Sequence, residues 1–260
     1  GVLARLKDGD PWTFDHLSSM WTRAQSRESL IAGRLGLAMH QLDALLAEDR
    51  EALLQIVADP SLLLLCEATP TWNLARRLEV AKGVRAMLPA PDELQPMTEE
   101  WRGLQLDPPG GPPWRQGWRA TEQFRSLVAD FEEPPGERLP QLLMERLGWR
   151  PEHQVRAAPG TSVFDMVVVA PPEHLPTTLT WVGSETARRS RLVKTVYYAL
   201  TGKRGELKVD TVRTPRHSAA NAFAAELLAP RAFLVRNAPQ DGFWSEALVM
   251  EIARHCAVDV

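Results

Sequence analysis

Apolar residues at helical spacing dominate this chain, and the most regular run lies at residues 218–230, SAANAFAAELLAP. Ala220, Phe223 and Leu227 recur at steps of three and four, which places them on one face of a helix. The proline at position 230 predicts where that helix ends. The many small residues predict a tightly packed core helix that a neighbouring helix can approach closely.

Short helical patterns also fill residues 12–58. Ser26 predicts the N-cap of one helix, because a serine oxygen can accept a hydrogen bond from a free backbone amide. Gly36 interrupts the pattern, where a tight turn favours a residue that tolerates a positive φ. A second helix, from Ala38 to Leu46, is expected after this turn.

Two further helices and a proline-rich stretch come next. The run from Leu53 to Leu65 is strongly apolar and predicts a buried helix, too short to span a bilayer. Residues 72–88 predict an amphipathic helix whose polar face carries Arg76, Arg77, Lys82 and Arg85. We expect this face to be solvated, and the alternative is a surface that contacts phosphates. Residues 89–113 are rich in proline, which is typical of an extended, semi-rigid linker.

The remaining residues, 114–260, should combine helices with a small sheet. The expected helices are residues 114–128, 139–147, 187–200 and 246–260, and the expected strands are 164–172 and 179–182. Gly148 predicts a helix end, and the strands are predicted by their branched and aromatic residues. The predicted fold class is therefore α+β and mostly helical, with a helical domain over 1–88, a linker over 89–113 and a second domain over 114–260.

Composition narrows the functional classes. The chain has 260 residues, of which 44% are hydrophobic and 24% charged, the balance of a globular protein. Its net charge of −3 gives no overall field that would attract nucleic acid or a membrane. Two cysteines are too few for a disulfide framework and suit a reducing compartment. The sequence has no signal-peptide pattern and no apolar run of transmembrane length, so we expect a cytoplasmic protein that does not enter a membrane.

The N-terminal hairpin resembles the helix-turn-helix of the Xre/Cro repressors. In that pattern an alanine is followed by a glycine four residues later and an aliphatic residue six residues after that, and Ala32, Gly36 and Leu42 match it. The resemblance implies that the second helix reads the major groove of duplex DNA. The candidate DNA-binding residues are Arg34, Met39, His40 and Gln41.

Charge argues against this DNA-binding interpretation. Residues 26–50 carry three arginines against four acids, whereas neutralised phosphates supply most of the affinity of such modules. His40 and Gln41 could still hydrogen-bond base edges. A hairpin used only for packing or for forming a homodimer is therefore the alternative.

The helix at residues 218–230 resembles the E-A-N-x-F-A-A-x-L-L-M-P helix of the ImmA/IrrE family of zinc metallopeptidases. The matching residues are Asn221, Phe223, Ala224, Ala225, Leu227, Leu228 and Pro230. Gln116, Gly117 and Arg125 match the family's opening pattern, W-x-Q-G-Y-x-x-A-x-x-L-R. The resemblance covers about residues 114–260 and implies a zincin-like domain, in which helix 187–200 stands where the family has R-R-x-x-x-A-H-E-x-x-H.

The metal-binding positions implied by this resemblance are altered. In active members the zinc is held by the two histidines of the A-H-E-x-x-H helix and by the first glutamate of the E-A-N-x-F-A-A helix. A different glutamate, the one between the histidines, activates the metal-bound water. The matching residues are Lys194, Thr195, Tyr198 and Ala219, which offer neither zinc ligands nor a general base. His217 is the one weak metal-ligand candidate. We therefore expect no metal and no other cofactor.

Side chains should fill the space that the metal would occupy. Lys194 and Tyr198 are one helical turn apart and should both project towards Ala219. We expect Tyr198 to pack over Ala219 with its hydroxyl hydrogen-bonded, and Lys194 to pair with an acid or remain in water, because an unpaired buried charge is costly. The alternative is that the helix is rotated and both side chains lie at the surface.

These patterns predict a non-catalytic regulatory or sensory protein that binds a regulatory protein partner and could also bind duplex DNA. Its expected role is in the control of transcription, stress responses or phage defence. One alternative is an active zinc metallopeptidase with unusual ligands that cleaves a repressor. A second alternative is a DNA-binding repressor.

Overall fold

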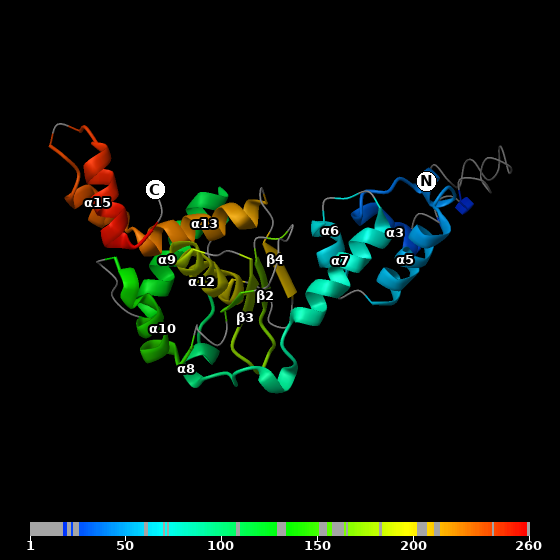
Figure 1. The fold of residues 1–260 in the computed structure, drawn as a ribbon, viewed down its shortest axis with the longest axis horizontal. Coiled ribbons are helices and arrows are strands. Elements are labelled where there is room, and N and C mark those ends of the chain that lie inside the picture. Colours follow the sequence, from blue (N-terminus) through cyan, green and yellow to red (C-terminus); the bar gives the residue numbers. More distant parts are fainter. Residues whose placement is uncertain are drawn as a thin grey trace. The chain divides into compact units, whose positions relative to one another are not determined.

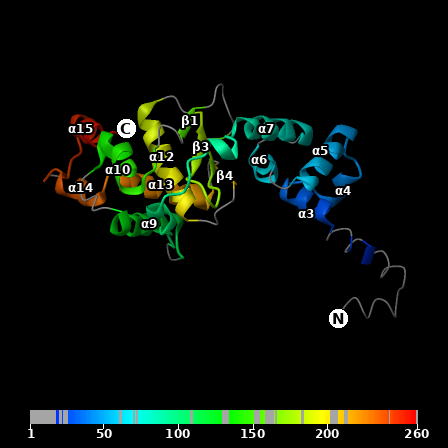
Figure 2. The same cartoon turned by 90° about the horizontal axis from the view of Figure 1, so that it is seen from below.

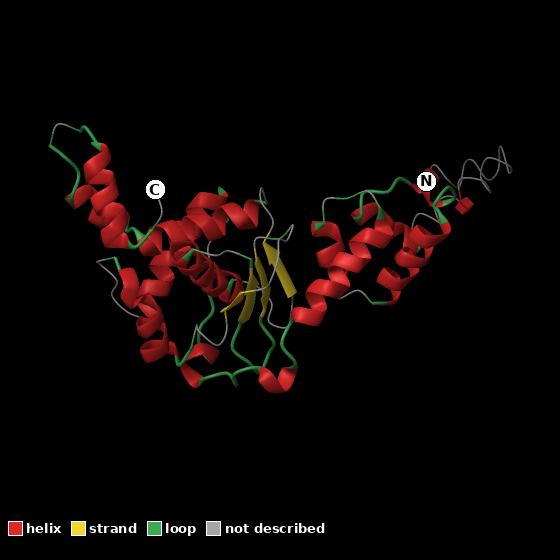
Figure 3. Cartoon of the chain, in the orientation of Figure 1, coloured by secondary structure: helices red, strands yellow, loops and turns green. Residues whose placement is uncertain are grey.

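The computed structural model describes residues 18–19, 22, 26–59, 62–69, 71, 73–107, 110–128, 134–150, 155–157, 164, 166–181, 184–201, 207–210, 214–240 and 242–258, with the side chains of 39, 40, 91 and 155–157 left out. The chain divides into two compact units, Gly1–Ala86 and Met87–Val260 (Figure 1). The described residues are mostly helical and include one small sheet, so the α+β class is confirmed (Figure 3). None of the described helices is both long and apolar enough to cross a membrane.

The first unit is a set of short helices. They are α3 (Arg27–Arg34), α4 (Met39–Leu42), α5 (Ala47–Ala58), α6 (Leu63–Ala68) and α7 (Leu74–Met87), whose last residue lies across the division. Their apolar faces meet in a core that includes Ala32, Ile56 and Leu65, all fully buried. The amphipathic patterns of the sequence thus account for this core.

The turn after α3 has the geometry that its glycine predicts. Gly36 has a φ of +84°, and the Leu37 amide donates to the Ala32 carbonyl over 2.9 Å. The helix that follows is shorter than expected, because α4 ends at Leu42, residues 43 and 44 form a turn and residues 45 and 46 are not helical. The prediction of a second helix reaching Leu46 is therefore wrong.

The apolar run from Leu53 to Leu65 is two helices rather than one. α5 ends at Ala58, and Asp59 has an extended backbone with φ −123° and ψ 85°. The residue before a proline disfavours helical geometry, and Asp59 precedes Pro60. The sequence signal for a break was therefore present and outweighs the continuous hydrophobicity.

Arg77 does not lie on the polar face of α7, as the sequence analysis expected. It is 8% exposed, and its guanidinium donates to the Leu35 carbonyl over 2.8 Å and to the Thr71 carbonyl. The Arg77 guanidinium therefore joins the end of α3 to the segment before α7. The other three basic residues of that face, Arg76, Lys82 and Arg85, are exposed.

The second unit contains the sheet and the longer helices. Its helical elements are η2 (Pro91–Glu93), α8 (Glu99–Arg102), α9 (Pro113–Val128), η3 (Gly136–Arg138), α10 (Leu139–Leu147), α12 (Glu185–Leu200), α13 (Pro215–Leu228), α14 (Arg231–Arg236) and α15 (Glu246–Cys256). Its strands are β1 (Val155–Ala157), β2 (Met166–Val169), β3 (Thr177–Thr180) and β4 (Leu207–Asp210). α10 has the expected bounds, and Gly148 ends it with a φ of +64°.

The sheet has the strand order β1-β3-β2-β4, in which β1 is parallel to β3 and the other pairs are antiparallel. β2 lies within the predicted strand 164–172, whereas β3 begins two residues earlier than the predicted 179–182. β4 was not predicted. α12 packs on the sheet through β2 and β3, and α13 packs against α12 and α9 (Figure 2).

The proline-rich residues 89–113 are not a free linker, which corrects the prediction. The amide of Leu175 donates to the Gln95 carbonyl, and the amide of Leu106 donates to the Leu200 carbonyl. Trp101 is 2% exposed and its ring lies 5.5 Å from that of Trp149. The second unit therefore begins at Met87 rather than at residue 114, since this stretch supplies part of its core.

α13 is the closely approached core helix that its small residues predict. Ala220, Phe223 and Leu227 are fully buried, and α13 ends at Leu228, two residues before Pro230. A β-carbon added to Gly117 of α9 would lie only 2.2 Å from the Ala219 carbonyl oxygen. The two backbones therefore touch at a position where only glycine fits.

Candidate functional site

The C-terminal half of α12 is buried although it carries polar side chains. Ser184 caps the helix by accepting from the Ala187 amide over 3.2 Å, and every residue from 192 to 200 is buried. Lys194 and Tyr198 are both 2% exposed, and Thr195 is fully buried. Buried polar groups are expected to be hydrogen-bonded, so the partners of these side chains define the site.

Asp210, the last residue of β4, is the centre of the site. Its side chain is completely buried. Its Oδ2 atom lies 3.4 Å from the Lys194 ammonium, and its Oδ1 atom accepts from the Tyr198 hydroxyl over 2.6 Å. The side chains of Lys194 and Tyr198, one helical turn apart on α12, therefore converge on one carboxylate. The predicted pairing of Lys194 with an acid is confirmed.

His217 joins the same carboxylate from the first turn of α13. Thr214 caps this helix by accepting from the His217 amide over 3.0 Å, which fixes the position of the turn. The His217 Nδ1 atom lies 2.6 Å from Asp210 Oδ1, and its Nε2 atom lies 2.8 Å from the Asn221 amide nitrogen. With the Asn221 amide nitrogen as the donor to Nε2, the ring donates from Nδ1 to Asp210.

We call Lys194, Tyr198, Asp210 and His217 the carboxylate cluster. Tyr198 stays a neutral hydrogen-bond donor, because burial raises the pKa of its phenol well above the usual range and the Asp210 carboxylate raises it further. The Lys194 ammonium and the Asp210 carboxylate neutralise each other inside the core, whereas a buried charge without a partner would be costly. The arrangement is that of a structural polar network.

β4 supplies a second buried cation next to the cluster. Lys208 is 4% exposed and donates to the Tyr198 carbonyl over 2.5 Å. Lys208 and Asp210 alternate along β4, so both face the buried side of the strand while Leu207 and Val209 are only half-buried. This inverted alternation explains why hydrophobic patterning missed β4 and Asp210.

Thr195 and Ala219 lie outside the cluster. The Thr195 hydroxyl donates to the Arg191 carbonyl over 2.8 Å and lies 2.7 Å from the Thr178 hydroxyl of β3, so it ties α12 to the sheet. Ala219 is buried, and its carbonyl faces Gly117 of α9. Tyr198 is hydrogen-bonded as expected, and its packing over Ala219 stays a prediction.

The residues at these positions do not fit the zinc site that the resemblance implies. Lys194 is engaged as an ammonium, Tyr198 as a neutral phenol, and Ala219 has no donor atom. A catalytic zinc takes about three protein ligands, whereas His217 and Asp210 are two and already contact each other. Among the residues that the structure describes, no three His, Cys, Asp or Glu side chains are grouped to hold a metal ion.

The DNA-binding candidates of the first unit are partly engaged within the chain. Arg34 forms a two-pronged ion pair with Glu67, at 2.5 and 3.0 Å. The Gln41 side chain accepts from the Ala38 amide over 2.7 Å and so caps α4. The side chains of Met39 and His40 lie outside the described residues.

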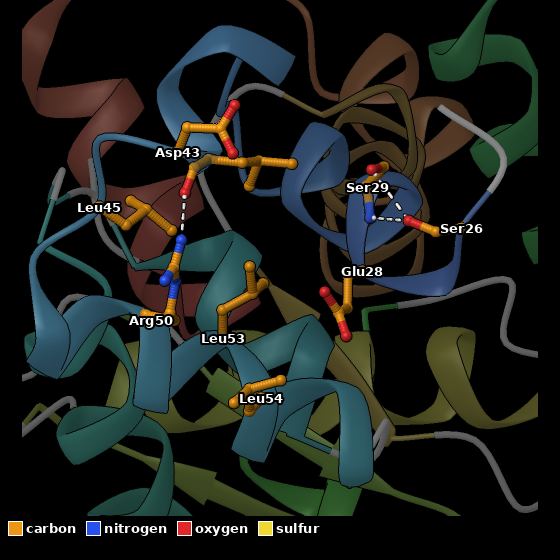
Figure 4. Close-up of a pocket in the computed structure, with 9 residues that line it drawn as sticks. Ser26, Glu28, Ser29, Asp43, Leu45, Arg50, Leu53 and Leu54 are labelled. Atoms are coloured by element: carbon orange, nitrogen blue, oxygen red, sulfur yellow. Dashed lines mark hydrogen bonds between the residues drawn. The ribbon is translucent and has the colours of Figure 1, made fainter. Parts of the chain in front are cut away.

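A cavity of about 200 Å³ lies between α3, α4 and α5 (Figure 4). Its charged lining residues are Glu28, Asp43 and Arg50, and Figure 4 shows Glu28 pointing from α3 towards α5. Arg50 donates to the Leu42 carbonyl over 3.5 Å, which stabilises the short end of α4. The cavity therefore belongs to the inner side of the hairpin and has two acids against one base.

The chain matches no protein-family model, no characterised protein and no solved structure.

Proposed function

We propose that the chain is a non-catalytic regulatory or sensory protein whose second unit is a degenerate ImmA/IrrE-like, zincin-type domain that acts by binding a partner protein. One observation carries the proposal: the residues aligned with the family's two histidines are used in the carboxylate cluster. Lys194 pairs with Asp210 at 3.4 Å, and Tyr198 donates to the same carboxylate. A buried ion pair with further hydrogen bonds replaces what a metal would contribute to holding the helices together.

The rival function is a zinc peptidase with unusual ligands, and metal content distinguishes the two. The purified full chain is dialysed against zinc and then analysed for metal, and its thermal unfolding is recorded with and without a chelator. We expect no stoichiometric zinc and no change in the unfolding temperature. Stoichiometric zinc that is lost in the His217→Ala variant would overturn the proposal.

Binding to a protein partner needs its own experiment. Crosslinking the tagged full chain in its native cells identifies candidates, and each is then produced separately and titrated with the purified chain. We expect at least one to bind saturably and to remain intact on prolonged incubation. A bound protein that is cut by the purified chain, with cleavage lost in the His217→Ala variant, would favour the peptidase.

DNA binding by the first unit is a second proposal, favoured by the Gly36 turn between α3 and α4. Because Arg34 is paired with Glu67, we expect only non-specific binding to duplex DNA, with a dissociation constant of about 10⁻⁴ to 10⁻⁶ M at physiological salt. Fluorescence anisotropy with the chain's own promoter measures it. Nanomolar binding that is lost on His40→Ala plus Gln41→Ala would make a repressor the better proposal.

A further inference from the structure

A second cavity, of about 410 Å³, lies in the second unit beside the carboxylate cluster. The polar residues that line it are Gln105, Asp107, Gln116, Tyr197, Thr201 and Arg216. They come from the segment after α8, from α9, from the end of α12 and from the first turn of α13. A cavity of this size holds a small molecule, and such sites combine apolar walls with a few polar groups.

Arg216 is a cation of this cavity with an unsatisfied donor atom, counted over the described part of the chain. Its guanidinium carbon lies 5.2 Å from the centre of the Tyr198 ring. Its Nη2 atom is buried and has no hydrogen-bond acceptor among the residues that the structure describes. A guanidinium carries five N–H donors and matches the two oxygens of a carboxylate or a phosphate, so the missing acceptor is an oxyanion.

The surroundings of Arg216 favour an anion and restrict what else the ligand carries. Arg216 lies in the first turn of α13, where the helix dipole is positive. Asp107 is exposed, so the same cavity offers a carboxylate that accepts from a ligand donor. Gln116 donates to the Gly111 carbonyl over 2.7 Å, which leaves its side-chain oxygen as another acceptor.

We propose that this cavity binds a small molecule that carries a carboxylate or a phosphate, with Arg216 contacting the oxyanion and Asp107 and Gln116 accepting from hydrogen-bond donors of the ligand. The proposal goes beyond the binding of a protein partner and does not rest on it. None of its lining residues occupies a position that the ImmA/IrrE resemblance assigns to the metal.

Inorganic phosphate and acetate are the probes that test the oxyanion site. Each is titrated into the full chain labelled with ¹⁵N-arginine at constant ionic strength, and the arginine Nε–H signals are followed by NMR. The Arg216 signal is assigned by its absence in the Arg216→Gln variant. We expect the Arg216 signal to shift saturably with at least one probe. A shift with only one of them identifies phosphate or carboxylate as the preferred oxyanion, and a shift with both shows that the site accepts either.

Variants of the cavity and a matched control make the test specific. Arg115→Gln is the matched control, because the Arg115 guanidinium also lies 5.2 Å from an aromatic ring, that of Trp114, but does not line the cavity. The affinity for the probe is measured from the rise in unfolding temperature that the probe causes. It should weaken about tenfold or more in Arg216→Gln and stay unchanged in Arg115→Gln. Should Arg216→Gln not fold, the exposed Gln105 is replaced by tryptophan to fill the cavity, with the same loss expected. A shift that never saturates, or binding unaffected by Arg216→Gln or by Gln105→Trp, would overturn the proposal.

Discussion

Lys194 on α12 and Asp210 at the end of β4 form an ion pair in which the two side chains are 3% and 0% exposed. The pair connects a helix to the edge strand of the sheet. Its members are close to each other in the fold because β4 turns inward the residues that a strand usually turns to solvent.

The first prediction is that the two members of this pair are strongly coupled. Asp210→Asn leaves a buried ammonium without its counter-charge and should lower the free energy of unfolding by about 3–5 kcal/mol. Lys194→Met combined with Asp210→Asn should cost clearly less than the sum of the single changes. Urea unfolding of the four proteins measures the coupling, and additive effects would contradict it.

The second prediction concerns the two tyrosines of the chain, Tyr197 and Tyr198. Burial is the main cause that raises the pKa of each phenol above the ordinary value of 10.0. Above about pH 10 the unfolded chain loses phenolic protons that the folded chain retains. Stability from these groups is therefore complete below that pH and falls above it, by up to about 1.4 kcal/mol per tyrosine and pH unit.

Phenolate absorbance measures this directly. At pH 10.0, the ordinary pKa of the phenol, the folded protein should show less phenolate than the protein in denaturant, which should titrate both tyrosines. Reversible phenolate formation in the folded state at the ordinary pKa would show that the rings are accessible to solvent.

The third prediction is that Gly117→Ala separates α9 from α13. The new β-carbon would lie 2.2 Å from the Ala219 carbonyl oxygen and 2.8 Å from the Phe223 amide nitrogen, and backbone atoms cannot move aside singly. We expect a loss of about 1–3 kcal/mol or more by denaturant unfolding. Gly103→Ala is the control in the same unit, since its β-carbon would have its nearest neighbour at 4.0 Å, and it should be almost neutral.

The fourth prediction is that the thiol of Cys66 does not react in the folded protein. Cys66 is fully buried, and burial raises the pKa of its thiol to about 11 although the nearby Arg77 guanidinium lowers it. Because the thiolate is the nucleophile, a disulfide reagent at neutral pH should modify Cys66 only after denaturant is added. Rapid modification without denaturant would show that the core of the first unit opens.

Sequence patterns predicted the elements in which burial follows hydrophobicity. α13 shows this, because its buried stripe and the proline at 230 mark its face and its end. α10 shows it as well, because Gly148 takes the left-handed conformation that stops a helix. At such positions local preference and tertiary packing agree.

The patterns failed where polar residues are buried or apolar runs are broken. Asp210 could not be found, since an acid at the end of a short strand is read as a surface residue. The linker prediction failed because the segment at 89–113 contains Trp101, whose burial outweighs the local preference of its prolines for an extended chain. The short α4 was missed because the apolar pattern continues through Leu45 and Leu46, whereas the helix ends at Leu42.

The close contact of α9 with α13 can form only late in the synthesis of the protein. Thr121 of α9 donates to the Phe223 carbonyl of α13 over a separation of 102 residues. A ribosome adding about 5–20 residues per second needs about 5–20 seconds to make that stretch. During this time the face of α9 that carries Gly117 and Phe124 has no partner helix, so the nascent chain exposes an apolar surface that a chaperone can occupy until α13 emerges.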